Sequence, residues 1–120
     1  MRILNLTQHA ASAEQVAAGV VELQDKAGVH RLLTFEACPD RETIRARAEA
    51  LAEIARASGA EAAMLGGAPY LMGPLEAALR AAGVRPVYAF SQRAGVEEEL
   101  QPDGSVRKVQ LFRHAGWVWA

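Results

Sequence analysis

An α/β fold with a mostly parallel central sheet flanked by helices is predicted by three features of the sequence. Short apolar runs such as Ile3–Leu6 and Ala62–Leu65 alternate with segments of helical periodicity. These runs end in polar residues or glycines, where a strand would meet a loop. Toward the C-terminus the period changes to that of an antiparallel hairpin. The 120 residues suffice for one domain with its own core, residues 1–120, and not for two.

The first strand and helix follow from local signals. Ile3–Leu6 is apolar and of strand length. Ser12, with Gln15 three residues later, has the form of a capping box, which opens a helix. Gly19 stands where this short helix would end. We therefore expect a strand, then a polar loop, then a short helix.

The segment up to Gly59 contains one well-marked helix. Residues 20–30 are polar and ambiguous, and residues 31–35 fit either a short strand or an apolar loop. Asp40, directly after Pro39, provides a stop followed by an N-cap. From there apolar residues recur at helical spacing up to Gly59, which occupies a C′ position. A long helix is thus predicted between Asp40 and Gly59.

The next part of the chain repeats the alternation of strand and helix. The expected elements are a buried strand at 62–65 ending in Gly66-Gly67, a helix from Pro69 or Pro74 to Gly83, and a strand at 86–90. Ser91, Gln92 and Arg93 form the polar exit of this last strand. Right-handed crossovers between such units would make the strands parallel.

A β-hairpin is predicted at about residues 95–114. Its two strands flank Pro102-Asp103-Gly104, a turn sequence that supplies the positive φ of hairpin connections. Glu97–Glu99 on one strand and Arg107–Lys108 on the other form either a solvated charge face or cross-strand pairs.

Two tryptophans follow the hairpin. Trp117 and Trp119 either cover an open edge of the core or lie in a subunit interface, where aromatic residues are enriched.

Composition limits the classes of function and the cellular compartment that we expect for the protein. The formal net charge of −1 argues against binding of long nucleic acids, which needs a basic excess. Cys38 is the single cysteine, which excludes an intrachain disulfide and fits a reducing compartment. The apolar stretch at the N-terminus is too short for a secretory signal, and no window reaches the ~20 apolar residues of a membrane span. We therefore expect a cytoplasmic protein that makes no contact with membranes.

Three strand exits are predicted to form one ligand-binding crevice, because parallel strands end at the same edge of a sheet. Gly66-Gly67 lets the backbone approach a ligand closely, and the helix that follows offers free N–H groups to an anion. A tight turn without a ligand is the alternative for this pair. The residues that we expect to bind the ligand are Thr7, Gln8, Gly66, Gly67, Ala68, Ser91 and Gln92.

His9 and Arg93 are the candidate catalytic residues. A histidine at a strand exit can move protons near neutral pH, and an arginine supplies a fixed positive charge with forked donors. The alternative for His9 is a residue that only hydrogen-bonds its own loop. The three histidines are scattered without a ligand-spaced partner, so no metal site is predicted.

The N-terminal run resembles a known group of proteins. Asn5–Gln15 is similar to the opening of small CRISPR-associated proteins of type III systems, which begin with a strand, a Ser/Thr and a His, and then a Ser/Thr-x-x-Gln helix start. The likeness is firmest over residues 3–15 and continues in general layout through Gly66–Pro69 and Phe90–Arg93. Those families resemble the Rossmann-like (CARF-like) domains that bind cyclic oligoadenylate, and they include ring nucleases, which cleave this second messenger of antiviral defence.

The resemblance implies a homodimer, because a cyclic ligand suits a two-fold binding face. It also implies cleavage without metal or cofactor, by attack of a ribose 2′-hydroxyl on the adjacent phosphate. His9 would then do the acid/base work, and either Arg93 or backbone N–H groups would stabilise the developing charge. Two other functions stay open: a non-catalytic module that binds or sequesters a nucleotide or anion, and a structural protein that oligomerises.

Overall fold

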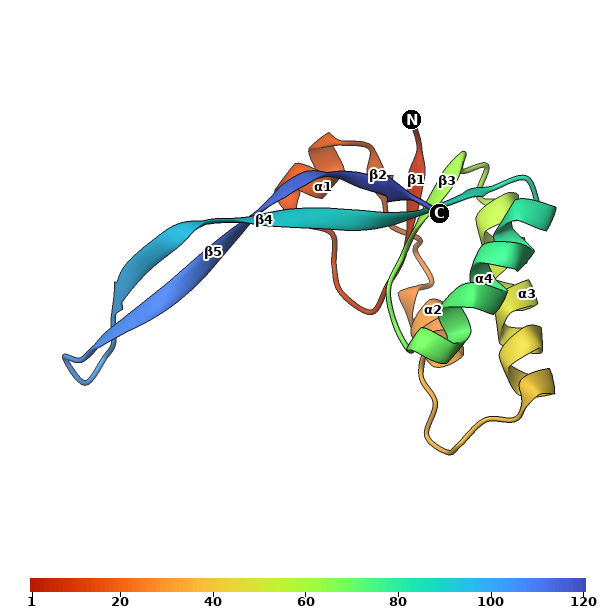
Figure 1. The fold of residues 1–120 in the computed structure, drawn as a ribbon, viewed down its shortest axis with the longest axis horizontal. Coiled ribbons are helices and arrows are strands. Elements are labelled where there is room, and N and C mark those ends of the chain that lie inside the picture. The colour runs from red at the N-terminus through yellow and green to blue at the C-terminus, as the bar shows by residue number, and fades with distance from the viewer.

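The computed structural model describes residues 1–120 and shows a mixed α/β fold around one five-stranded sheet (Figure 1). The order across the sheet is β2-β1-β3-β4-β5; β1 pairs in parallel with β2 and β3, β3 pairs in parallel with β4, and β5 is antiparallel to β4. The predicted α/β class, mostly parallel sheet and antiparallel hairpin are therefore confirmed. The strands are β1 (Ile3–Leu6), β2 (Val20–Val21), β3 (Ala62–Leu65), β4 (Arg85–Leu100) and β5 (Val106–Trp119).

Four helices connect these strands. They are α1 (Ala13–Ala17), α2 (Lys26–Leu33), α3 (Arg41–Ala57) and α4 (Pro69–Ala81). None of them has both the length and the apolar surface that crossing a membrane would require.

The central strands β1 and β3 are buried along their whole length. Ile3 of β1 pairs with Ala62 of β3 on one side and with Val20 of β2 on the other. Both faces of these strands are covered, which explains why their sequences are nearly continuous apolar runs instead of alternating ones. Asn5 is the one polar residue among the buried ones.

One face of the sheet carries the main core, which α2, α3 and α4 cover. Leu71, Leu75 and Leu79 recur every fourth residue along α4, lie on one face of the helix and are fully buried. From α3, Leu51 packs in the same cluster beside small alanines such as Ala48 and Ala55, which let the helix lie close to its neighbours. This layer of helices fixes the positions of β1 and β3 in the sheet.

The opposite face carries a smaller apolar cluster, formed by Ile3, Val20, Ala62, Met64 and Val87. Trp117 packs against this cluster, as one of the two interpretations of the tail predicted. Trp119 stays partly exposed, with the Arg85 guanidinium 4.1 Å from its ring centroid. This cluster has five buried residues and the main core has fifteen, so the two faces of the sheet are covered unequally.

The predicted helix boundaries are confirmed at α1 and α3. The Ser12 hydroxyl accepts from the Gln15 N–H, and the Gln15 side chain accepts from the Ser12 N–H, which completes the capping box. Asp40 caps α3 by accepting from the Thr43 N–H at 2.7 Å. Gly59 follows α3 with a φ of +75°, the left-handed conformation that ends a helix.

The interpretation of residues 31–35 as a strand or apolar loop was wrong. Residues 31–33 are the last turn of α2, which Asp25 caps by accepting from the Gly28 N–H. Val29 and Leu33 lie one helical turn apart and are both buried in the main core. Tertiary burial of this narrow stripe therefore decides the conformation of a segment whose local pattern is ambiguous.

The predicted end of the fourth strand at Phe90 was also wrong. β4 runs from Arg85 to Leu100, because β5 pairs with it from Val87 onward, with register shifts between Phe90 and Ser91 and between Arg93 and Gly95. Ser91, Gln92 and Arg93 are therefore strand residues and not a strand exit. The hairpin itself is confirmed, with Gly104 in its turn at a φ of +87°.

Replacing Leu75 with alanine should lower the free energy of unfolding by about 2–5 kcal/mol, since the side chain is fully buried between α4 and the sheet. Urea denaturation followed by circular dichroism measures this change. Val16→Ala, at an exposed position of α1, is the control and should shift the free energy by less than about 0.5 kcal/mol. Equal effects of the two substitutions would contradict the assignment of the core.

Candidate functional site

The ends of β1 and β3 form the walls of one cavity of about 430 Å³. The parallel orientation predicted for these strands brings their exits to the same edge of the sheet. β4 contributes Tyr88 and Ala89, which follow the last residue of β4 that pairs with β3. The polar or glycine residues that line the cavity are Thr7, Gln8, His9, Ser12, Gln15, Gly66, Gly67 and Tyr88.

Gly66 allows the two strand exits to lie close together. A Cβ atom at this position would lie 3.2 Å from Cγ2 of Thr7, which is tighter than ordinary van der Waals contact. Gly67 has a φ of +151°, a conformation that other residues rarely adopt. The geometry of this turn therefore favours glycine at both positions, and the backbone of the pair also lines the cavity.

The side-chain amide of Asn5 organises the loop after β1. Asn5 is 4% exposed, yet all of its hydrogen-bonding capacity is used. Its Nδ2 donates to the His9 carbonyl and to Oε1 of Glu22, both at 2.8 Å. Its Oδ1 accepts from the Thr7 N–H at 3.0 Å and from the Thr7 hydroxyl at 2.7 Å. This one side chain thus fixes the path of residues 7–9.

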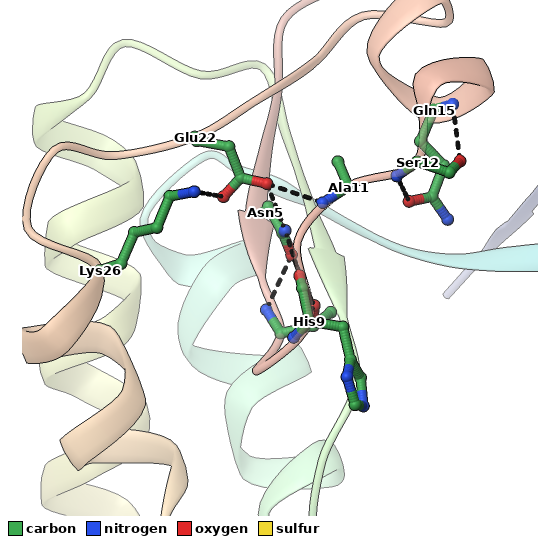
Figure 2. Close-up of polar contacts among 8 residues, drawn as sticks. Asn5, His9, Ala11, Ser12, Gln15, Glu22 and Lys26 are labelled. Carbon is green, nitrogen blue, oxygen red and sulfur yellow. Dashed lines mark hydrogen bonds and ion pairs between the residues drawn. The ribbon is translucent and has the colours of Figure 1, made fainter.

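Glu22, directly after β2, extends the same network. Its Oε1 also accepts from the Ala11 N–H at 2.9 Å, and its Oε2 lies 3.6 Å from Nζ of Lys26 (Figure 2). Burial alone would raise the pKa of Glu22, but the hydrogen bonds from Asn5 and Ala11 and the charge of Lys26 together lower it below its ordinary value. The carboxylate is therefore ionised at neutral pH and anchors both ends of the loop.

The imidazole of His9 takes no part in this network. Only the backbone of His9 is used: its carbonyl accepts from Asn5, and its N–H donates to the Thr7 hydroxyl at 3.2 Å. Figure 2 shows the ring directed away from Asn5 and Glu22, and the residue is exposed where it lines the cavity. Both ring nitrogens are thus open to a ligand, and the loop that carries the ring is held in place.

Two other polar side chains of the cavity already have partners. Gln8 donates from Nε2 to the Thr34 hydroxyl at 2.8 Å, which ties the loop to the end of α2. The hydroxyl of Tyr88 donates to Glu76 at 2.7 Å, and burial together with this carboxylate raises the pKa of Tyr88 to about 12. Tyr88 is therefore neutral where it lines the cavity, and it is no proton donor to a ligand because its hydroxyl already donates to Glu76.

The structure does not bring all of the sequence-predicted residues to the cavity. Thr7, Gln8, His9, Gly66 and Gly67 line it, as the convergence of strand exits predicts. The other four lie outside its lining: Ala68 is the N-cap of α4, and Ser91, Gln92 and Arg93 lie further along β4.

The cavity is lined by neutral polar groups, one histidine and the apolar residues Ala10, Met64, Leu65 and Ala89. No lysine or arginine is among its lining residues. The chain also contains no group of three or more His, Cys, Asp or Glu side chains placed to hold a metal ion. The chemistry available at this site is hydrogen bonding together with proton transfer by an imidazole.

Comparison with family models places the chain in a family. A model described as "Uncharacterized protein MJ1673 family" matches residues 1–118. The chain belongs to the MJ1673 family. The matched range includes both the cavity and the β4–β5 hairpin. Comparisons with curated proteins and with solved structures found no match.

Sequence reasoning missed the residues that support the site of this MJ1673-family protein. The sequence pattern predicts Asn5 only as part of a strand, and Glu22 lies in the segment without a clear pattern. The capping-box pattern predicts only a helix start at Ser12 and Gln15, yet both residues line the cavity. One signal was present: Asn5 is a polar residue within an otherwise apolar strand sequence, and a buried amide needs partners.

We expect the stability of the MJ1673-family protein to depend on the ionisation of Glu22. Because folding lowers the pKa of Glu22 below its ordinary 4.5, the carboxylate stabilises the fold above that pH. This contribution is lost as the pH falls through the folded-state value. Glu22→Gln should therefore destabilise the protein at pH 7 and have a progressively smaller effect below pH 4.5.

Urea unfolding of wild type and variant over this pH range measures the difference. Glu49→Gln, which removes an exposed carboxylate on α3, is the matched control. A Glu22→Gln effect that stays constant with pH would show that the carboxylate stabilises the loop by packing alone.

Proposed function

We propose that the cavity between the ends of β1 and β3 binds a phosphate-bearing nucleotide, and that this ligand is cyclic oligoadenylate. The resemblance of residues 3–15 to type III CRISPR-associated proteins supports the choice of ligand. The observation that carries the proposal is the His9 imidazole, which is free of partners at the cavity while its backbone is held by Asn5. Such a protein would act in the cytoplasm, where its ligand is made.

Ser12 and Gln15 are well suited to donate hydrogen bonds to phosphate. In the capping box the Ser12 hydroxyl oxygen accepts from a backbone N–H, which leaves its own proton free. Gln15 uses only its Oε1 in the box, so its NH₂ group is also free to donate. Both side chains line the cavity together with His9. The cap thus orients two donors toward a ligand.

We further propose that the bound ring is cleaved. A ribose 2′-hydroxyl attacks the adjacent phosphorus and gives up its proton to a base, and the bond from phosphorus to the 5′ oxygen breaks as that oxygen takes up a proton. The products are a 2′,3′-cyclic phosphate and a 5′-hydroxyl, and no water is consumed. His9 supplies one of the two proton transfers. Ser12, Gln15 and the N–H groups of Gly66 and Gly67 stabilise the charge on the phosphate oxygens.

A second copy of the chain is part of the proposal. Cavities of about 300–1,000 Å³ hold drug-sized molecules, and a ring of several adenylates is larger than these. One cavity of about 430 Å³ therefore accommodates only part of such a ring. A homodimer would present two cavities to a ligand with rotational symmetry. Ser91, Gln92 and Arg93 then contact the ligand only where it extends from the cavity onto β4.

Binding without cleavage is the second candidate function. The absence of lysine and arginine from the cavity favours it, because a developing phosphate charge is usually stabilised by a cation. A protein of this kind would sequester the nucleotide and release it unchanged.

Replacing His9 with alanine should slow ring opening by about 10² to 10⁴-fold and leave the ligand affinity within about threefold, because the imidazole acts on the reaction more than on binding. Incubation of the protein with cyclic tetra-adenylate or cyclic hexa-adenylate, followed by chromatography and mass spectrometry, measures linear product of unchanged mass. His30→Ala is the matched control, since His30 lines a different cavity on α2. It should leave cleavage and affinity unchanged.

Ala10→Trp should fill the cavity and weaken ligand binding. Calorimetric titration with each ring measures the affinity. Binding without product in the wild type would select sequestration over cleavage. If neither ring bound at micromolar concentrations, cyclic oligoadenylate would be rejected as the ligand.

A further inference from the structure

The hairpin extends well beyond the rest of the molecule (Figure 1). We define the arm as residues 91–114, the part of β4 and β5 beyond the sheet, with its turn. The radius of gyration is 16.5 Å, whereas a compact chain of this length has about 14 Å. β3 pairs with β4 only up to Val87, so within the arm the two strands pair with each other alone. An isolated two-stranded ribbon is marginally stable in water.

One face of the arm exposes four large apolar side chains. Side chains alternate between the two faces of a ribbon, so Val96 lies on the same face as Leu100, and Val106 on the same face as Phe112. The pairing of Leu100 with Val106 places all four on one face. Their exposed fractions are 55%, 75%, 58% and 61% in the order Val96, Leu100, Val106, Phe112. Large apolar side chains exposed together on one face favour an interaction surface, although Glu98, Lys108 and Gln110 lie between them on this face.

The same face carries one cross-strand pair of opposite charges. Glu98 on β4 lies opposite Lys108 on β5, between the pairs Val96–Gln110 and Leu100–Val106. The arm as a whole has four basic and four acidic residues and is neutral. Neither a polyanion nor a basic partner is therefore favoured by its charge.

We propose that this face packs against the same face of the arm of a second copy, about a two-fold axis that runs along the arm. This operation places β4 of one arm over β5 of the other, at equal height along the ribbon. Glu98 then faces Lys108 of the second copy, and Leu100 faces Val106 of the second copy. The surface is thus complementary to itself in charge at Glu98 and Lys108 and in hydrophobicity at Leu100 and Val106, whereas Val96 faces Gln110 of the second copy and Phe112 faces Arg93 of the second copy.

Edge-to-edge pairing of the arms is disfavoured by the same charges. Two β4 edges would bring Glu97, Glu98 and Glu99 of one copy beside those of the other. Two β5 edges would do the same with Arg107, Lys108 and Arg113. Like charges side by side on neighbouring strands are destabilising, so packing of faces is the arrangement that the sequence permits.

The proposal adds a surface to the homodimer and holds or fails independently of the ligand. Sedimentation velocity of the full chain without ligand, from about 1 to 200 μM, covers the range in which modest interfaces associate. The wild type should form a dimer, and the Leu100→Ser/Phe112→Ser variant should remain a monomer. Both positions are exposed within one chain, and unchanged circular dichroism verifies that the variant is folded.

Charge exchange tests the predicted orientation. Glu98→Lys should raise the dimer dissociation constant at least about tenfold, because the change occurs at two symmetric contacts. Adding Lys108→Glu to it should restore the constant to within about threefold of wild type. Glu97→Lys makes the same charge change on the opposite face of the arm and should leave the constant nearly unchanged.

A wild-type chain that sediments as a monomer throughout would overturn the proposal, as would a dimer that the Leu100→Ser/Phe112→Ser variant leaves intact. A dimer in which Glu97→Lys and Glu98→Lys have equal effects would also overturn it. Nucleotide binding by the cavity is measured separately on His9 and Ala10 variants, so a failure of the ligand proposal is distinguishable from a failure of this one.

Discussion

The geometry of the candidate site depends on the buried amide of Asn5. Placing an amide among apolar side chains is costly unless each of its groups is bonded, and here all of them are. The partners come from the loop after β1 and from Glu22 after β2, so one side chain joins two strand exits. Because the loop is held through its backbone, the His9 imidazole is left free. The backbone atoms of His9 therefore stabilise the loop, while its imidazole remains available for chemistry.

Most of the fold could be predicted because its signals are local. The capping residues Ser12 and Asp40 and the glycine after α3 mark helix ends in the sequence alone. The end of β4 could not be predicted in this way. Phe90-Ser91 looks like the transition from a strand to a polar loop, but the partner that keeps the strand extended, β5, is set by pairing at a distance. Periodicity describes one segment and does not include its neighbour in the sheet.

About half of the predicted site lies together in space, for a physical reason. Residues at the exits of β1 and β3 converge because parallel neighbours end at one edge, and this follows from topology. The prediction that Arg93 and its neighbours lie at the same edge requires all three strands to end at one level, but β4 continues to Leu100. The supporting residues were missed because their role depends on the distance between the ends of β1 and β2, which no spacing in the sequence encodes.

The position of β1 in the sheet has a consequence for how the chain acquires its structure. Its parallel partner β3 begins at Ala62, after three helices have been made, so on the ribosome β1 has only the two-residue β2 beside it. Contacts of such long sequence separation form slowly, because the intervening chain must be ordered first. The early helices are therefore exposed to off-pathway association until β3 is synthesised. Slow translation after α3 would lengthen this vulnerable interval.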